Sequence, residues 1–486
     1  MIRDVLFRFA SPFISQKVLR GLENIPNTNE EIALSQNKVL YYIIKKISTC
    51  EMGRDLGIKA NIGVNEMEDF PLTTYQDYIT YIENIKDGNP HQIWQGKPLF
   101  MAETSGSAGN KKYIPISKEL LRNQLSGRRN AVASVINLYG AKRILKSPPL
   151  SFGDAPIFSQ FGDIKSAPIS AILACQMPSW SKYFSRPSTV TRKIPLFKDR
   201  IQSIYNEIAE SPPGFIVAMP AWMRDFFSSL NVEQLQTIIA ANPVLNLSGT
   251  SPKPYLNYLQ TVFDNTLDFV ETYPTSEGFL GWQDRKSETG IRLYVNDGIY
   301  FELLYENGRT NPITKTAVGD MGELVITTCS GLFRYCIGDL ISVVSLNPIR
   351  VIIIGRKSET LSVFGEHLLT SETDTVIKSA CEYYKIPMFD YIVSPAPLKD
   401  NSKSHHVWMI ETDEQTLPEN LSAYINGELC KLNMCYRDLY NDGVLACPMI
   451  IPIKPSTILN YYKSRGRIGL QQKLPRLLKE GISFND

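Results

Sequence analysis

The stretch Thr104-Ser-Gly-Ser-Ala-Gly-Asn-Lys-Lys112 follows a short apolar run, Pro98-Leu-Phe-Met-Ala102. An apolar run that leads into a Gly- and Ser-rich segment predicts a strand entering a tight loop. Backbone N–H groups and hydroxyls in such a loop can converge on phosphate oxygens, and small residues permit the close approach. The two lysines that end the stretch can neutralise added negative charge. The stretch therefore predicts a phosphate-binding loop.

The spacing within this loop excludes one familiar class of nucleotide-binding site. A Gly-x4-Gly-Lys-Ser/Thr loop needs glycine five residues before its second glycine, and Thr104 occupies that place relative to Gly109. A conventional nucleotide-triphosphatase loop is therefore excluded. Taken alone, the stretch also fits an ordinary surface loop, so its function depends on what accompanies it.

Composition places the chain among ordinary globular proteins. Its 486 residues exceed one hydrophobic core and indicate two or three domains, and 43% apolar with 21% charged residues is the usual balance. A net charge of +2 without a concentrated basic stripe argues against nucleic acid as a partner. The basic segment 463–479 fits a solvated surface.

Targeting signals and metal motifs are not indicated. The segment 1–22 is amphipathic and interrupted by charges, which predicts a docked first helix and not a signal peptide. No run approaches the ~18 to 20 apolar residues of a membrane helix. The eight cysteines form no Cys-x-x-Cys pair, so neither a zinc site nor a dense disulfide framework is expected. We expect a cytoplasmic protein without a membrane partner.

Hydrophobic patterning predicts an α/β fold. The segment 39–48 has helical periodicity, and 214–219 fits a buried strand followed by a turn at Pro220 and a helix over 222–227. Buried strands alternating with helices indicate a mostly parallel sheet covered on both faces. Between residues 291 and 344 the strands become closely spaced, which favours an antiparallel or barrel-like part.

A polar break near 355–357 predicts a domain boundary. About 130 residues of mixed α+β character follow it, enough for one small domain. The predicted domains are residues 1–355 and residues 356–486.

Two further elements carry residues suited to nucleotide chemistry. In Glu271-Thr-Tyr-Pro-Thr-Ser-Glu277, an apolar strand runs into a turn with hydroxyls and a carboxylate that could bind Mg²⁺ together with substrate phosphates. In Leu332-Phe-Arg-Tyr-Cys-Ile-Gly-Asp339, we expect a strand that ends at Gly-Asp and presents a carboxylate to a ribose diol. Each fits an ordinary turn equally well when considered by itself.

The last two elements follow the predicted boundary. Gly355-Arg356 precedes the segment Phe364-Gly-Glu-His-Leu368, and Gln471-Gln-Lys-Leu-Pro-Arg476 lies near the C-terminus. A lysine on a mobile small domain, here Lys473, could approach a carboxylate and an α-phosphate as a movable positive charge. Seen singly, Lys473 fits a solvated surface lysine.

The order of these five elements resembles that of the acyl-adenylate-forming superfamily. Within it, the chain resembles the auxin-responsive "GH-three" acyl acid amido synthetases, which conjugate carboxylic acids to amino acids. The resemblance covers nearly the whole chain and rests on the segments 71–75, 104–117, 273–277, 300–302 and 333–339. The Tyr-Phe-Glu element at 300–302 and the Phe-Gly-Glu-His segment distinguish this family from acyl-CoA ligases.

The resemblance implies ATP and Mg²⁺ as cofactors and a role for each matching residue. Glu277 would bind Mg²⁺ and Lys473 would meet the adenylate site from the mobile small domain, so that both count as catalytic. The nucleotide-binding positions it implies are Thr104, Ser105, Gly106, Ser107, Lys112, Tyr273, Thr275, Ser276, Phe333, Tyr335, Asp339 and Arg356. Among them, Asp339 would hold the ribose and Arg356 would lie at the domain hinge.

The chain departs from the family pattern at two positions. Cys336 stands where plant members carry arginine, and Ala108 replaces a hydroxyl residue. The chain is also shorter than the plant enzymes, as bacterial members are. These differences bear on the acyl and acceptor specificity more than on adenylation.

The implied reaction adenylates a carboxylic acid and transfers its acyl group to an amine, expected to belong to an amino acid. An acyl-CoA ligase shares the first half of this reaction and differs in forming a thioester. A catalytically inactive binding module with the same fold is the alternative from another class. The sequence identifies neither the acid nor the amine, and it does not fix the oligomeric state.

Overall fold

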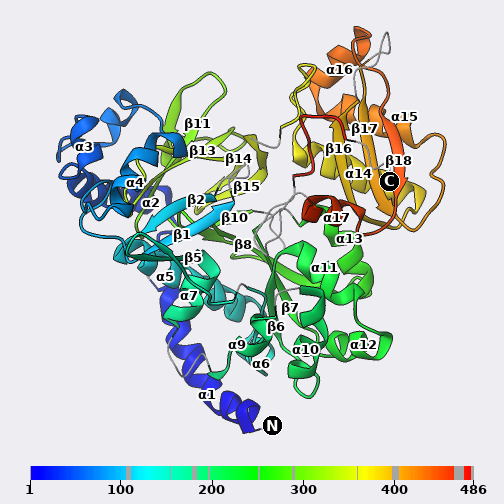
Figure 1. The fold of residues 1–486 in the computed structure, drawn as a ribbon, viewed down its shortest axis with the longest axis horizontal. Helices are drawn as coiled ribbons and strands as arrows, with labels where there is room; N and C mark the ends of the chain where they lie inside the picture. The colour runs from blue at the N-terminus through cyan, green and yellow to red at the C-terminus, as the bar shows by residue number, and fades with distance from the viewer. Residues whose placement is uncertain are drawn as a thin grey trace. The chain divides into compact units, whose positions relative to one another are not determined.

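The computed structural model describes residues 2–23, 25–105, 111–153, 155–177, 183–194, 197–249, 252–286, 290–357, 360–396, 404–464 and 475–482 (Figure 1). Its contacts divide the chain into two compact units. Unit 1 comprises Met1–Thr250, Leu267–Ile337 and Ile341–Ile352, and unit 2 comprises Ser251–Thr266, Gly338–Leu340 and Ile353–Asp486. The predicted division after residue 355 stays a prediction.

Unit 1 holds the predicted α/β fold. Its helices are α1 (Ile2–Leu19), η1 (Arg20–Leu22), α2 (Asn29–Ile47), α3 (Glu51–Asp55), η2 (Val64–Asp69), η3 (Tyr75–Tyr78), α4 (Ile79–Lys86), α5 (Lys118–Tyr139), α6 (Ala141–Ile144), α7 (Ile169–Gln176), α9 (Thr189–Arg192), α10 (Phe197–Ile208), α11 (Pro220–Ser228), α12 (Val232–Ala240) and η4 (Ile313–Lys315). Its strands are β1 (Phe100–Ser105), β2 (Lys111–Ile116), β3 (Leu150–Ser151), β4 (Ser159–Phe161), β5 (Ile164–Pro168), β6 (Phe215–Ala218), β7 (Val244–Ser248), β8 (Asp268–Pro274), β9 (Phe279–Trp282), β10 (Ile291–Leu293), β11 (Ile299–Leu304), β12 (Thr310–Pro312), β13 (Met321–Thr328), β14 (Tyr335–Leu346) and β15 (Ile349–Arg356).

One large sheet joins the two kinds of strand that the patterning predicts. Within the described ranges, its order is β12-β11-β13-β14-β15-β10-β9-β8-β7-β6-β3. The neighbours β3, β6, β7 and β8 are parallel, and β8 to β9 begins the antiparallel part. Both predictions are confirmed, and the antiparallel strands continue the same sheet as the parallel ones. A second sheet has the order β2-β1-β5-β4.

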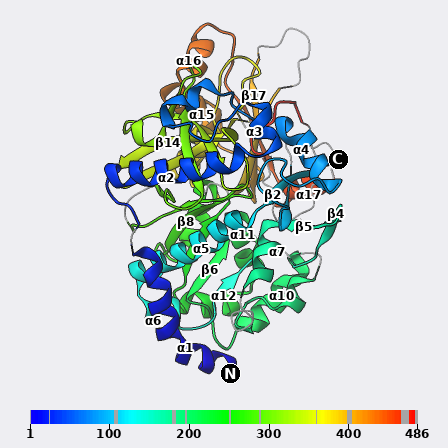
Figure 2. The same ribbon diagram turned by 90° about the vertical axis from the view of Figure 1, so that its left-hand side faces the viewer.

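Helix α5 is the central helix of unit 1. It begins at the N-cap Ser117, whose hydroxyl accepts from the Leu120 N–H, and it ends at Gly140 in a positive-φ conformation. It packs on β9 and β8, and α1 docks against it, as predicted for the first helix. Figure 2 shows α5 crossing in front of β6 and β8.

Two sequence-based expectations about element ends are wrong. The predicted turn at Pro220 is the first residue of α11, because proline is well suited to the first helical turn, where its missing N–H needs no partner. Asp339 lies inside β14 and not after the end of a strand. Gly338 takes a φ of 84°, which bends the strand locally without ending it, so the Gly-Asp pair is no turn.

Unit 2 is a small α+β unit. Its elements are α13 (Lys253–Val262), α14 (Thr370–Tyr384), β16 (Met388–Pro395), β17 (His406–Thr412), α15 (Leu421–Leu432), α16 (Met434–Asn441), β18 (Met449–Ile453) and α17 (Thr457–Ser464). The described strands form a sheet of order β16-β17-β18, and α14 and α15 pack together over its core. In the part of the chain that is described, no helix is long and apolar enough to cross a membrane.

Candidate functional site

The predicted phosphate loop connects the two strands of a hairpin. Strands β1 and β2 pair antiparallel, with Thr104 opposite Lys112 and Ser105 opposite Lys111. Residues 106–110, which include Gly106 and Ser107, lie outside the described residues. The hairpin therefore fixes where the loop begins and ends.

The two lysines after the loop have different surroundings. The Lys111 ammonium lies 2.8 Å from the Glu103 carboxylate, and this hydrogen bond raises the pKa of Lys111. The Lys112 ammonium lies 5.3 Å from the centre of the Tyr75 ring. Among the described residues, no carboxylate pairs with Lys112. Its charge is therefore available to a phosphate, whereas that of Lys111 is already balanced.

The turn that carries Glu277 joins β8 to β9. Its backbone is closed by the Thr275 N–H, which donates to the Gly278 carbonyl at 2.9 Å, and by the Thr275 hydroxyl, which makes hydrogen bonds with the same glycine. Helix α5 holds the turn through two hydrogen bonds. The Gln124 amide donates to the Thr275 carbonyl at 2.7 Å, and the Asn123 side chain accepts from the Phe279 N–H at 2.9 Å. Gly278 leaves room for Ile299, because a Cβ at 278 would lie 2.3 Å from the Ile299 Cδ1 atom and that side chain would have to move.

Within this turn the predicted site residues differ in exposure. Ser276 and Tyr273 are buried, and Thr275 and Glu277 are partly exposed. In the described part of the chain no cation forms an ion pair with Glu277. The turn thus presents one carboxylate that has no counter-ion among the described residues, as a Mg²⁺ ligand would require.

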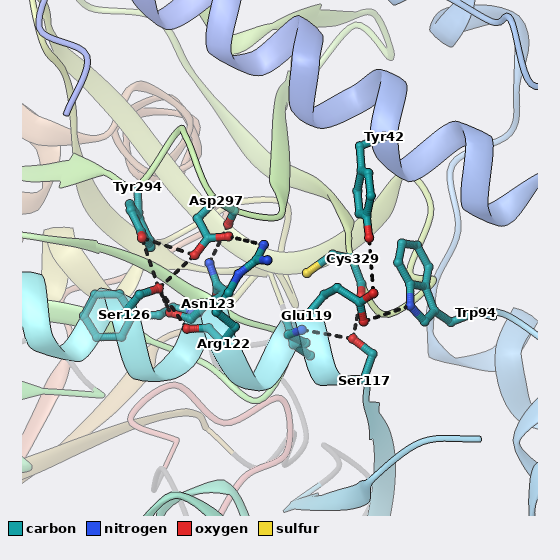
Figure 3. A network of polar contacts seen from close by, with 12 residues as sticks. Tyr42, Trp94, Ser117, Glu119, Arg122, Asn123, Ser126, Tyr294, Asp297 and Cys329 are labelled. Carbon is teal, nitrogen blue, oxygen red and sulfur yellow. Dashed lines mark hydrogen bonds and ion pairs between the residues drawn. The ribbon is translucent and has the colours of Figure 1, made fainter. Parts of the chain in front are cut away.

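The N-terminus of α5 is tied to the antiparallel strands. The Ser117 hydroxyl donates to the Cys329 carbonyl at 2.6 Å, and the Ser117 N–H donates to the Ser330 hydroxyl. Figure 3 shows Tyr42, from α2, and Trp94 both directed at Glu119 in the first turn of α5, at 3.2 and 3.4 Å.

Asp297, in the segment before β11, forms a second set of contacts with α5, one turn further along the helix (Figure 3). Arg122 pairs with this carboxylate at 2.8 Å, and the hydroxyls of Ser126 and Tyr294 donate to it at 2.8 and 3.3 Å. Burial, followed by the charge of Asp297, raises the pKa of Tyr294 to about 12. These contacts fix α5 relative to the segment that precedes β11.

The segment that carries Phe333 and Tyr335 is held by a neighbouring chain segment. Thr73 pairs with it in parallel: its N–H donates to the Arg334 carbonyl and its carbonyl accepts from the Cys336 N–H. The Thr73 hydroxyl donates to the Phe333 carbonyl at 2.6 Å. The Tyr78 hydroxyl accepts from the Phe333 N–H at 2.7 Å.

The two aromatic side chains predicted to lie near the nucleotide are both buried. Phe333 packs edge-on against Phe70 with 5.7 Å between ring centres, and Tyr335 packs against Tyr78 at 5.9 Å. Burial, with a smaller contribution from the charge of Glu277, raises the pKa of Tyr335. Both side chains belong to the hydrophobic core, and their proximity to a nucleotide stays a prediction.

The residue between these two aromatics forms an ion pair that sequence reasoning missed. Arg334 takes a φ of 44°, which is uncommon for a side chain with a Cβ. Its guanidinium pairs with Glu302 at 3.0 Å, and both side chains are almost completely buried. It also donates to the Thr310 hydroxyl at 2.5 Å and to the Phe70 carbonyl. Burial raises the pKa of Glu302, and Arg334 opposes that rise.

This ion pair links two motifs that the sequence showed separately. Glu302 is the last residue of the Tyr-Phe-Glu element, and Arg334 stands in the segment that begins at Leu332. The only available signal was the presence of an acid in one motif and a base in the other. Nothing in the spacing of 32 residues indicates that they touch.

Two predicted nucleotide residues lie together in the parts of β14 and β15 that belong to unit 2, residues 338–340 and 353–356. The Arg356 guanidinium, at the end of β15, lies 2.8 Å from the Asp339 carboxylate in the neighbouring strand β14. Asp339 is buried, and Arg356 is partly exposed. The predicted ribose ligand and the predicted hinge residue are therefore ion-paired.

Lys473 lies outside the described residues, but its segment has an anchor nearby. The largely buried Arg476 guanidinium pairs with Asp390 at 3.3 Å and lies over the Tyr255 ring at 4.9 Å. The Arg476 carbonyl accepts from the Val393 N–H at 2.7 Å, which attaches the segment to β16. Sequence reasoning gave this arginine no role, although it stands three residues after Lys473.

The comparisons with protein-family models decide the classification. The chain matches the GH3 family N-terminal domain over residues 21–209, the GH3 family central domain over residues 292–356 and the GH3 family C-terminal domain over residues 371–482. The chain belongs to the GH3 family. The resemblance drawn from the motifs is confirmed at this level.

The relatives of this GH3-family chain are distant. Indole-3-acetic acid-amido synthetase GH3.4 of Arabidopsis thaliana is 23% identical over 411 aligned residues, which cover 69% of this chain and 68% of that protein. The probable indole-3-acetic acid-amido synthetase GH3.4 of Oryza sativa subsp. japonica is 22% identical, with 95% of this chain and 88% of that protein covered.

Solved structures confirm the predicted fold class. The GH3.15 acyl acid amido synthetase superposes with a TM-score of 0.78 at 17% identity and covers 93% of this chain and 92% of its own. A 2-hydroxyisobutyryl-CoA ligase in its postadenylation state superposes with a TM-score of 0.57 at 11% identity, covering 93% and 89%. The fold is thus a mixed α/β fold shared by GH3 proteins and acyl-CoA ligases.

Proposed function

We propose that this GH3-family chain uses ATP to adenylate a carboxylic acid and then transfers the acyl group to an amine of an amino acid, forming an amide. In the first step, a carboxylate oxygen attacks the α-phosphorus and pyrophosphate leaves. In the second step, the amine attacks the acyl carbon, AMP leaves, and the amine loses a proton. The curated relatives, named as indole-3-acetic acid-amido synthetases, support this class of reaction.

One structural observation carries the proposal. Helix α5 follows the β1–β2 hairpin, which carries the predicted phosphate loop. It holds the Glu277 turn through Asn123 and Gln124, and Ser117 bonds to the segment before Phe333. Three segments predicted to bind ATP are therefore fixed to one rigid helix. Such fixed positions reduce the reorganisation needed when a charged transition state forms.

The residues proposed for the nucleotide have charges suited to it. Lys112 has no described carboxylate partner and would neutralise phosphate charge. The loop residues Thr104 to Ser107 would donate hydrogen bonds to phosphate oxygens. Tyr273, Thr275 and Ser276 would bind the nucleotide beside the metal, and Phe333 and Tyr335 would lie close to it. At the remaining proposed positions, Asp339 would bind the ribose, Arg356 would lie at the hinge and Lys473 would meet the adenylate.

Mg²⁺ fits the donors present. Among the described residues, no group of three or more His, Cys, Asp and Glu side chains forms an all-protein metal cage. Mg²⁺ that binds together with substrate phosphates needs only one or two carboxylates, and Glu277 would supply one. When bound, the ion would stabilise negative charge on the phosphate oxygens.

The domain roles follow from the same proposal. Residues 1–355 would bind ATP and the acid, and residues 356–486 would form a mobile domain that brings Lys473 to the adenylate. Alternating domain positions would let one site serve both half-reactions and exclude water from a hydrolysable intermediate. Cytoplasmic localisation and a bacterial-type origin stay predictions.

The test is an ATP-dependent screen of carboxylic acids crossed with amino acids, read by mass spectrometry. We expect an amide together with AMP and pyrophosphate for at least one pair. Thioester formation with coenzyme A and no amide would identify an acyl-CoA ligase instead. Neither pyrophosphate exchange nor AMP with any acid in a broad panel would identify a binding module.

A further inference from the structure

Three arginines on α5 have three different surroundings. Arg122 is paired with Asp297 (Figure 3), and Arg129 is exposed. Arg128 is only partly exposed, and its Nε atom is buried without a hydrogen-bond partner. Within the described ranges no carboxylate forms an ion pair with it, and burial alone lowers its pKa to about 10. An arginine held in this way is unfavourable unless a ligand supplies the missing anion.

A second unpaired polar atom lies one turn away on the same face. Gln124 precedes Arg128 by four residues, about 6 Å along the helix. Its amide nitrogen donates to the Thr275 carbonyl, whereas its Oε1 atom is buried and has no partner. Two buried unsatisfied atoms on adjacent turns of one helix face call for an explanation, and a polar ligand that contacts both would supply one.

The position of Arg128 along the sheet can be read from contacts on either side of it. Helix α5 runs antiparallel to β8, because Tyr139 bonds to the Phe269 carbonyl near the start of β8 and Gln124 bonds to the Thr275 carbonyl just past its end. Arg128 therefore lies level with the carboxyl-terminal part of β8. In open α/β sheets, ligands bind beside the carboxyl ends of the parallel strands.

The layer between α5 and the sheet changes character toward Arg128. Two turns after it, Val135 packs with Val244 and Val270 in an apolar cluster. Two residues further along the same faces of these strands stand Asn246 and Thr272, whose side chains are buried and hydrogen-bonded to each other at 3.0 Å. The sheet thus becomes polar at the level where the unpaired guanidinium lies.

We propose that Arg128 binds a second, non-reacting carboxylate of the acid substrate, so that the preferred acid is dicarboxylic. This inference rests on the proposed adenylation of a carboxylic acid and specifies the class of that acid. The reacting carboxylate is not the partner, because it loses its charge when it is adenylated and would leave Arg128 unpaired again. A second carboxylate keeps its charge through both steps, and its oxygens match the guanidinium donors.

The experiment compares acids that differ only by the second carboxylate. Pairs such as hexanoate and adipate, or phenylacetate and 4-carboxyphenylacetate, are assayed by ATP–pyrophosphate exchange in the absence of amino acid. For the wild type we expect kcat/KM to be about tenfold or more higher for the diacid of matching length, as a charge-assisted hydrogen bond provides. Arg128→Gln should remove this preference and leave the monoacid rate nearly unchanged.

The matched control is Arg129→Gln, which changes the exposed neighbour on the same helix and should keep the preference. An equal diacid-to-monoacid ratio in the wild type and in Arg128→Gln would overturn the inference while the proposed function stands. The inference would also be overturned if Arg128→Gln left exchange unchanged and raised KM for the amino acid, since Arg128 would then bind the acceptor.

A binding measurement separates failure of the inference from failure of the proposed function. Thermal shift with adipate alone, without ATP, should raise the Tm of the wild type more than hexanoate does, and Arg128→Gln should lose this difference. If no acid supported exchange but this difference remained, Arg128 would still be a carboxylate site and the proposed adenylation would be wrong. Arg128→Met should have a Tm no lower than the wild type, because it removes an unpaired charge. A large fall would make Arg128 structural and overturn the inference.

Discussion

Two regions of unit 1 differ in whether they hold charged side chains without an ion-pair partner. Around Phe333, the buried charges are paired: Arg334 is satisfied by Glu302, Thr310 and the Phe70 carbonyl. Around α5 and the β1–β2 hairpin, three charged side chains have no described ion-pair partner: Lys112, Glu277 and Arg128. Paired buried charges stabilise a local structure, whereas charges left without a protein partner are ready to bind a ligand. The difference separates residues that hold the fold from residues proposed to meet the substrates.

The largest effect should come from the unpaired carboxylate. Glu277→Ala should lower pyrophosphate exchange about 10³-fold or more, because a metal ligand that supplies several kcal/mol of charge stabilisation is removed. The Tm should stay close to that of the wild type. Glu306→Ala, at an exposed position of the same unit, is the control and should retain normal exchange. Near-normal activity of Glu277→Ala would remove Glu277 from the site.

The paired region should respond in stability instead. Glu302→Gln leaves the Arg334 guanidinium buried without its counter-ion, so the free energy of unfolding should fall by about 3 to 5 kcal/mol. Urea unfolding followed by circular dichroism measures this change. The exposed Glu306→Gln should change stability by less than about 0.5 kcal/mol. A similarly small change for Glu302→Gln would show that the contrast between the two regions does not hold.

The neighbouring lysines test the comparison within one strand. Lys112→Ala should lower kcat/KM for ATP about 10- to 100-fold, since one charged contact to a phosphate is lost. Lys111→Ala should have a much smaller effect, because Lys111 is largely exposed and its charge is already paired with Glu103. Steady-state kinetics with varied ATP distinguish the two. Equal effects of both substitutions would mean that ion pairing does not predict which lysine meets the nucleotide.

The smallest effect concerns a paired carboxylate in unit 2. Glu366 and His406 are fully buried and lie 2.9 Å apart. Burial tends to raise the pKa of Glu366, but the hydrogen bond from His406 and backbone donors hold it below its ordinary value of 4.5. A lowered folded-state pKa gives stability that is present above pH 4.5 and is lost as the pH falls through the folded value.

Thermal unfolding at pH values from 7 to 3 measures this contribution. Glu366→Gln should show a shallower fall of Tm in the acid range than the wild type. Glu382→Gln, which changes an exposed carboxylate of α14, should leave the pH dependence as it is. Identical slopes for Glu366→Gln and the wild type would remove Glu366 from the acid-sensitive groups.

Part of the fold followed from local sequence pattern. Buried strands alternating with helices predicted the parallel strands β6 to β8, and dense apolar alternation after residue 291 predicted the antiparallel part. Both depend on periodicity within a few residues, which a sequence shows directly. The end of a strand is harder to predict: the Gly-Asp pair, common in turns, predicts a strand that ends before Asp339, whereas Gly338 only bends β14.

The candidate site, like the fold, has features that the sequence predicts and features that only packing decides. The sequence by itself determined the order of the motifs and hence the family, and it predicted that the Gly- and Ser-rich loop after β1 binds phosphate, since these depend on residue types that stand next to one another. Only the tertiary structure decided which charges are paired. Arg334, in the segment before β14, and Glu302, in β11, meet only when the chain packs, and Arg128 stays unpaired because no described carboxylate reaches it on α5. Pairing depends on distances and burial that arise when the chain packs, and a linear sequence contains neither.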